Sequence, residues 1–452
     1  MRSTYLSRSL FGCTRISLLT AALLVGTILL PVEGAAQQTG NSQQPGSTTE
    51  APSMAEHAGM AASLRELIQE AEQRNPQIAA SFHAWQASRN VPKQASALPE
   101  TQLSVQQFSV GSPRPFAGYS NSDFAYIGFV ASQDIPYPGK RQLRADVAEH
   151  EADSMEAQTD SVRRTVVGNL KIVYFRLGYI QQTLGVLQRS DELLNQVQQA
   201  SEERYHVGQG NQQDVLKAQL QHTKILQEIA HHHQEEGLLE AQIKQALGRP
   251  QESADIVAEA LTLRTFPYTS AQLLQRAREQ NPDVHAKQAS IRQQETQVEL
   301  ARKNFRPDFN VQYNYEHTGS QTRDYYMATF GIRLPNRGRQ KAELAEAQEN
   351  QERARQELDG ESQRVLSEVQ QQYVRATTSE ERLKIYSDGL VPQSEATFQS
   401  ALSAYQSNRQ DFESLLSGFL DVLNFDLEYR NELVEHESAL AELERLTGVD
   451  LP

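Results

Sequence analysis

The chain carries the same pattern twice, and this internal duplication constrains its fold more than any local motif does. The segment LRELIQEAEQRNPQI at residues 64–78 reappears as LLQRAREQNPDV at residues 273–284. Further landmarks recur about 200 residues apart along most of each half, which is the signature of a tandem repeat. We therefore predict two repeats, each with two short strands set between very long helices. The predicted bounds are residues 62–260 and 268–450.

The N-terminus has the pattern of an exported protein. Residues 1–36 combine three arginines, an apolar run at 16–30 and small residues before Gln37, as a secretory signal does. Cys13, the only cysteine, precedes the apolar run, whereas a lipoprotein signal would place it afterwards, so we predict no lipid attachment. Residues 37–60 are polar and predict a flexible leader. No later stretch could cross a bilayer as a helix, so any crossing must use strands.

The composition argues against ordinary compact domains. Only 38% of the residues are hydrophobic and the mean hydropathy is −0.60, whereas a compact chain of this size has a large interior to fill with apolar side chains. Long helices with narrow apolar seams, or a hollow assembly, would explain the shortfall. The net charge of −14 argues against nucleic acid as a partner, because phosphates need cationic contacts.

Each repeat contains two stretches with the period of two that typifies strands with one apolar face. They are predicted at 102–110 and 124–135, and at about 309–316 and 325–334, the last two joined by a polar loop from His317 to Thr322. Strands of about 9–11 residues with one apolar face suit a tilted outer-membrane strand. The alternative is a small soluble sheet packed on helices. The side chains predicted to face lipid are Phe309, Val311, Tyr313 and Tyr315.

The helices predicted around these strands are too long for a globular domain. Residues 141–204 lack proline and carry apolar residues at steps of four and three, which predicts a coiled-coil seam. A helix of about 64 residues would be about 95 Å long. A second long helix is predicted over 341–404, bent near Pro392. A filamentous coiled coil is the alternative, but filaments do not carry paired amphipathic strands within each repeat.

This order of elements resembles the TolC-like outer-membrane efflux channels over about residues 62–450. The resemblance rests on the Asn-Pro start of each repeat, on the Pro/Gly corner with basic residues at 136–141 and 335–339, and on the turns at 205–216 and 405–416. It implies a mainly α fold with a membrane β-barrel. Four strands cannot close a barrel alone, and in this family three chains share one of about twelve strands. Their helices form a periplasmic tunnel whose tips dock an adaptor.

The resemblance places the docking tips at the two helical turns. Gly208 and Gly210 are expected to supply the positive φ of a tight reversal, and Asn408 is the next best residue for it. The predicted docking residues are Tyr205, Gly208, Gly210, Asp214, Tyr405 and Asn408.

Some family members have two aspartates after the second tip that form an acidic constriction. Here those positions are Ser414 and Ser417, so the constriction cannot be copied from the family. The acidic candidates nearby are Asp411, Glu413 and Asp421, with Asp214 in the first repeat.

No motif for catalysis or metal binding is apparent. The sequence has no phosphate-binding loop, no HExxH and no nucleophile elbow, so we predict neither an enzyme nor a cofactor. Consecutive residues on a helix point in different directions, so His231, His232 and His233 are interpreted as a solvated face rather than a metal site. The corner Pro-Tyr-Pro-Gly-Lys-Arg nonetheless resembles the heavy-metal and cation efflux branch of the family.

The predicted function is a passive outer-membrane conduit of a tripartite efflux system that carries small molecules or metal cations. The expected partners are two further copies of the chain, a periplasmic adaptor, an inner-membrane pump of the RND type and outer-membrane lipid. The expected location is the outer membrane with an extension into the periplasm. The alternatives are the conduit of a type I protein secretion system and a periplasmic coiled-coil adaptor that never enters a membrane.

Overall fold

A computed structural model describes most of the chain after the predicted leader. The described residues are 60–61, 63–110, 124–264, 267–318, 324–407 and 409–449. No helix in these ranges combines the length and the apolar character needed to cross a membrane.

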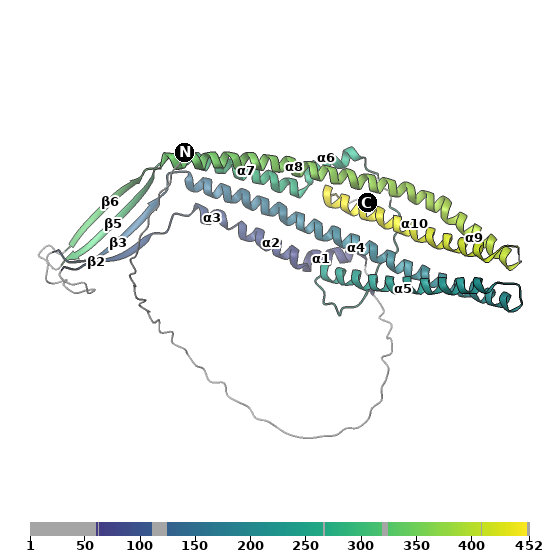
Figure 1. Ribbon diagram of the computed structural model, residues 1–452. Coiled ribbons are helices and arrows are strands. Elements are labelled where there is room, and N and C mark those ends of the chain that lie inside the picture. Colours follow the sequence, from purple (N-terminus) through teal and green to yellow (C-terminus); the bar gives the residue numbers. More distant parts are fainter. Residues whose placement is uncertain are drawn as a thin grey trace, which may run out of the picture. The chain divides into compact units, whose positions relative to one another are not determined.

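The same series of elements occurs twice (Figure 1). The first series contains β1 (Met60–Ala61), α1 (Leu64–Arg74), α2 (Pro76–Ser88), α3 (Val91–Ser96), β2 (Gln102–Phe108), β3 (Tyr126–Ile135), α4 (Lys140–His206), α5 (Gln212–Ala246) and β4 (Ile256–Val257). The second contains α6 (Ser270–Gln280), α7 (Pro282–Lys303), β5 (Asp308–Thr318), β6 (Asp324–Arg333), α8 (Arg337–Ile385), a π-helical turn (Tyr386–Leu390), α9 (Val391–Gln406) and α10 (Phe412–Thr447). The predicted mainly helical fold with two strand pairs is confirmed.

In each series a buried asparagine caps the N-terminus of the second helix, α2 or α7. Its side chain also bonds to the last helix of the same series, α5 or α10. Asn75 and Asn281 each cap a helix that starts with proline, and each side-chain oxygen accepts two backbone N–H groups. The side-chain amide of Asn75 donates to the carbonyl of Ala246 at 2.8 Å, and that of Asn281 donates to the carbonyl of Leu446 at 2.9 Å. The repeated Asn-Pro motif therefore joins the start of each series to the C-terminal end of that series' last helix.

Strands from both halves form one antiparallel sheet with the order β2-β3-β5-β6. The register places the predicted lipid-facing residues of β5 on one face, with Val311 opposite both Gln133 and Phe330. One prediction was wrong: His317 and Thr318 extend β5 instead of starting the loop, because they pair with Ile127 and Tyr126. The face shared by Val311 includes Leu103, Val105, Phe129, Ala131, Ile135, Phe309, Tyr313, Tyr315, Tyr326, Ala328, Phe330 and Ile332.

The long helices pack along narrow apolar seams, as predicted. Helix α4 runs for 67 residues and contacts α5, α7 and α10, while α8 contacts α7 and α10. The buried seam of α4 runs from Ala145 to Val197, and that of α8 from Ala347 to Leu383. The predicted bend near Pro392 takes the form of the π-helical turn just before it. Proline lacks the N–H needed to continue the α-helical ladder, which accounts for the irregular turn at this point.

Candidate functional site

The two turns between long helices lie together at the end of the hairpins opposite the sheet (Figure 1). Both line one open pocket of about 890 Å³, with residues 204–217 on one side and 405–414 on the other. We call this region the tip.

Tyr405 holds the two turns together from inside. Its side chain is only 3% exposed, and its hydroxyl lies 3.1 Å from the hydroxyl of Ser201. Because Ser201 donates to the carbonyl of Val197, the Tyr405 hydroxyl is the donor to Ser201. The Arg204 guanidinium lies 4.4 Å from the centre of the Tyr405 ring and donates to the Tyr405 carbonyl at 2.9 Å. Such stacking of a cation on a ring is attractive.

The matching tyrosine of the first turn has a different environment. Tyr205 is 44% exposed, and Val207 and Leu216 in the same segment of the chain are more exposed still. Large apolar side chains that gather on a surface mark contact sites for partners. The sequence reasoning identified Tyr205 but missed Val207 and Leu216, although both are apolar residues in a polar segment.

The two glycines of the first turn serve different purposes. The expectation that both have a positive φ is correct for Gly208 and wrong for Gly210. Gly208 has a φ of +74°, and the N–H of Gln209 donates to the carbonyl of Arg204, as in a Schellman cap. Gly210 has no positive φ. It is needed for space instead, because a Cβ there would lie 3.0 Å from the Tyr205 nitrogen and 3.2 Å from the Arg204 carbonyl carbon. Asn408 lies outside the described residues.

The predicted acidic residues lie near the tip but in different surroundings. Asp411 caps α10, and its bonds to the side chain and backbone N–H of Ser414 hold the pKa of that exposed carboxyl below its usual value. Glu413 forms an ion pair with Lys217 of α5, which joins the two hairpins. One of the three predicted pore carboxylates, that of Glu413, is therefore paired with a cation. Asp214 lies in the first turn of α5 and lines the pocket between the turns.

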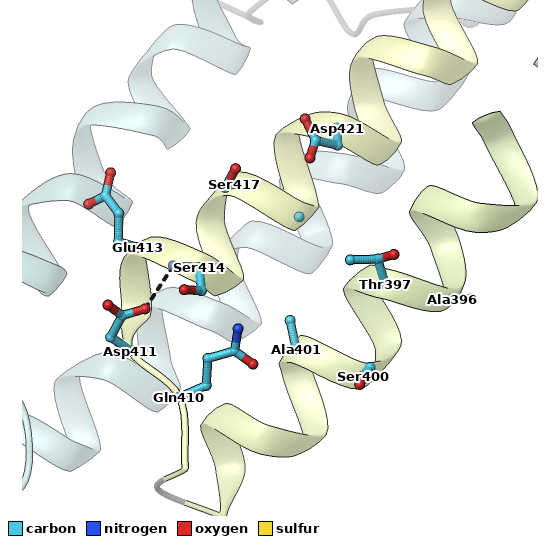
Figure 2. Close-up of a pocket in the computed structure, with 11 residues that line it drawn as sticks. Ala396, Thr397, Ser400, Ala401, Gln410, Asp411, Glu413, Ser414, Ser417 and Asp421 are labelled. Carbon is cyan, nitrogen blue, oxygen red and sulfur yellow. Dashed lines mark hydrogen bonds between the residues drawn. The ribbon is translucent and has the colours of Figure 1, made fainter.

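Asp421 borders a second pocket of about 720 Å³ between α9 and α10. Figure 2 shows Asp411 and Asp421 near the two ends of this pocket and Glu413 on the side of α10 that faces away from α9. Thr397, Ser400 and Ser417 also line this pocket. This surface can attract cations and form hydrogen bonds with polar groups.

The histidine run lies in the middle of α5 rather than at its tip end. His232 and His233 lie 3.5 and 3.3 Å from carboxylate oxygens of Glu235 and Glu236, one helical turn away. Within the described residues, no group of three or more histidine, cysteine, aspartate or glutamate side chains is placed to hold a metal ion.

The described chain thus combines a four-stranded sheet that has one apolar face with paired long hairpins whose turns are exposed. The chain belongs to the outer membrane efflux protein family, whose model matches residues 67–249 and 273–424. No curated protein matches the chain at a significant level.

Solved structures of outer-membrane channels share the fold at low sequence identity. The outer-membrane channel OprN is 17% identical, with a TM-score of 0.75 over 85% of this chain and 89% of that one. VceC from Vibrio cholerae is 19% identical, with a TM-score of 0.73 over 85% and 96% of the two chains. CusC is 16% identical, with a TM-score of 0.74 over 87% and 93%.

Proposed function

We propose that three copies of the chain form the outer-membrane channel of a tripartite efflux system, a passive conduit for small molecules or metal cations. The observation that carries this proposal is the apolar face that continues across all four strands, from Leu103 on β2 to Phe330 and Ile332 on β6, where these side chains are 64–81% exposed. An apolar surface of this extent needs a partner, and a tilted outer-membrane strand presents such a face to lipid.

The unpaired edges of the four-stranded sheet indicate that several copies of the chain share one barrel. In the described sheet, β2 and β6 each have one hydrogen-bonding edge without a partner strand, and a closed barrel removes such edges. Even a small barrel needs about eight strands, and three chains supply about twelve. Residues 1–36 would then direct export, residues 37–60 would form a leader, and the repeats would span residues 62–260 and 268–450.

The tip is the proposed contact site for a periplasmic adaptor, which would in turn connect the channel to an inner-membrane pump of the RND type. Tyr205 would contact the adaptor directly with its exposed ring, helped by Val207 and Leu216. Tyr405, Gly208 and Gly210 would hold the turns in position, and Asn408 and Asp214 are the other predicted docking residues. The carboxylates of Asp411 and Asp421, and of Glu413 when freed from Lys217, would favour the passage of cations in three copies around one axis.

Glycine substitutions at the tip test the docking role. Gly210→Val should displace the turn, because its Cβ would lie 3.0 Å from the Tyr205 nitrogen, so the backbone must shift to make room. Gly208→Val should strain the turn by about 1–2 kcal/mol through its positive φ alone. Both variants should reach the outer membrane as trimers, since the long seams hold the fold, yet bind the adaptor weakly and fail to restore resistance in a deletion strain.

Gly237→Ala on α5 is the matched control, because a Cβ there meets no atom within 4 Å. It should restore resistance fully. Normal adaptor binding and normal resistance with Gly210→Val would contradict the assignment of the tip as the docking site.

A further inference from the structure

Positive charge is concentrated where the four-stranded sheet meets the helices (Figure 1). The ten residues on the helix side of β2, β3, β5 and β6 contain one, three, three and three lysines or arginines, respectively, against three carboxylates in all. These four segments are residues 92–101, 136–145, 298–307 and 334–343, and the carboxylates are Glu100, Glu299 and Glu343. The whole chain has the opposite balance, with 57 acidic and 43 basic residues. The excess of cations is therefore a local property of this junction.

The strands themselves are almost free of cations. Within β2, β3, β5 and β6 the only lysine or arginine is Arg333, the last residue of β6. It lies on the polar face, where its guanidinium pairs with Asp134. The apolar face of the described strands thus carries no lysine or arginine up to the point where the helices begin.

Three exposed cations lie together at this boundary, and we call them the junction cations: Arg306, Arg337 and Lys341. Arg306 precedes β5, whereas Arg337 and Lys341 begin α8 after β6. The strands β5 and β6 are neighbours, with Asp308 opposite Arg333. Arg306 and Arg337 therefore leave the sheet at adjacent strand ends.

Three carboxylates near this junction pair with other cations and leave the junction cations without a protein counter-charge. The pairs are Asp308 with Lys140, Asp134 with Arg333 and Glu343 with Arg339. Within the described residues, no ion pair involves a junction cation, and all three side chains are exposed. Such charges remain available to an anionic surface within about 10 Å, the distance over which physiological salt screens them.

The position of the junction cations matches the edge of a bilayer. Phe309 and Leu334, the nearest large apolar residues of β5 and β6, are each three positions from Arg306 or Arg337, and Leu334 is 78% exposed. Three extended residues span about 10 Å, and the head-group layer outside the hydrocarbon is about 5–8 Å thick on each side. Long basic side chains lay their apolar stems along such a boundary and place their charges among the head groups.

We propose that the junction cations bind the phosphate groups of anionic phospholipids in the leaflet nearest the helices. This inference rests on the proposed function, because it needs the apolar face of the sheet to lie in a bilayer. Lysine and arginine near an anionic leaflet are attracted to it, and interfacial cations fix how a protein sits in the membrane. Lipid binding at the junction would hold the sheet at one depth while the helices extend into water.

The test counts the lipids that the purified protein retains. The detergent-extracted trimer is incubated with equal amounts of phosphatidylglycerol and phosphatidylcholine that carry the same acyl chains, and native mass spectrometry counts both lipids. The parent protein should retain phosphatidylglycerol in excess. Arg306→Gln, Arg337→Gln and Lys341→Gln together should lower that excess about fivefold or more, since one cation near an anionic surface already contributes roughly this ratio. Each single substitution should lower it in part.

Two sets of variants separate charge from structure. Lys224→Gln, Arg278→Gln and Arg375→Gln remove three exposed cations elsewhere on α5, α6 and α8, and should leave the lipid ratio unchanged. Arg306→Lys with Arg337→Lys keeps both charges and should keep the excess. If the triple glutamine variant does not assemble, the single substitutions and the lysine pair carry the same comparison.

The possible failures have different readings. Equal excess of phosphatidylglycerol in assembled trimers of the parent and the triple glutamine variant would overturn the lipid site and leave the proposed function standing. Displacement of the lipid by millimolar inorganic phosphate, but not by sodium chloride of equal ionic strength, would also overturn it, since the cations would then hold a free anion. Absence of trimers for the parent protein would count against the proposed function itself.

Discussion

Val311→Arg is expected to prevent assembly of the channel in the outer membrane. Val311 lies on a central strand of the sheet, with Gln133 and Phe330 as its neighbours on the apolar face. Arginine on the lipid face of an outer-membrane strand costs about 2–4 kcal/mol near the bilayer midplane. A trimer carries this cost in each of its three chains, and it is a large fraction of the about 5–15 kcal/mol by which a fold is typically stable. The measurement is the amount of trimer in outer-membrane fractions.

Gln312→Arg is the matched control because it introduces the same charge on the next residue. Gln312 lies on the polar face, opposite Ser132 and Thr329, where the proposal places water. Its trimer level should stay close to that of the parent protein. A normal trimer level for Val311→Arg, or equal losses for both variants, would show that the apolar face does not contact lipid.

Lys140→Met is expected to destabilise the junction between helices and sheet. Lys140 is 3% exposed, and its ammonium group donates to Asp308 at 2.8 Å and to the carbonyl of Arg306 at 2.9 Å. The Tyr137 N–H donates to the same Asp308 oxygen at 2.8 Å. Breaking a buried pair costs about 3–5 kcal/mol, and we expect about 2–3 kcal/mol here because Asp308 is 31% exposed.

Thermal denaturation of the detergent-solubilised protein measures this loss. Arg333→Gln is the matched control, because its pair with Asp134 lies near the same junction but is 67% and 40% exposed on its two side chains. Such exposed pairs contribute about 0–1 kcal/mol. Asp308→Leu combined with Lys140→Met should recover part of the loss, since no carboxylate remains unpaired. An unchanged denaturation temperature for Lys140→Met would contradict the structural role of the junction.

Local patterns predicted most of the fold. The period of two located the four strands of the larger sheet, and the steps of four and three located the seams of α4 and α8, because alternation and helical spacing follow directly from backbone geometry. The end of β5 was missed because His317 and Thr318 are polar and look like a loop, although the ladder with β3 continues through them. Helix α3 and the pair β1–β4 were not predicted. They span six and two residues, which is too short for a periodic pattern to appear in the sequence.

The tip was harder to predict because its key contacts break the symmetry of the duplication. Lys217 pairs with Glu413, yet the matching positions of the other repeat are Ser417 and Gln213. Arg204 likewise stacks on Tyr405, whereas Ala404 precedes Tyr405 at the matching position. Contacts between residues about 200 positions apart follow from packing, which local patterns do not record.

The most direct test of a shared channel is the number of chains in the complex extracted from outer membranes. Native mass spectrometry of the protein in mild detergent measures that number without assuming any contact. We expect three chains, because the four-stranded sheet of one chain has two open edges and cannot close a barrel. A folded, membrane-extracted single chain with its sheet intact would contradict the account.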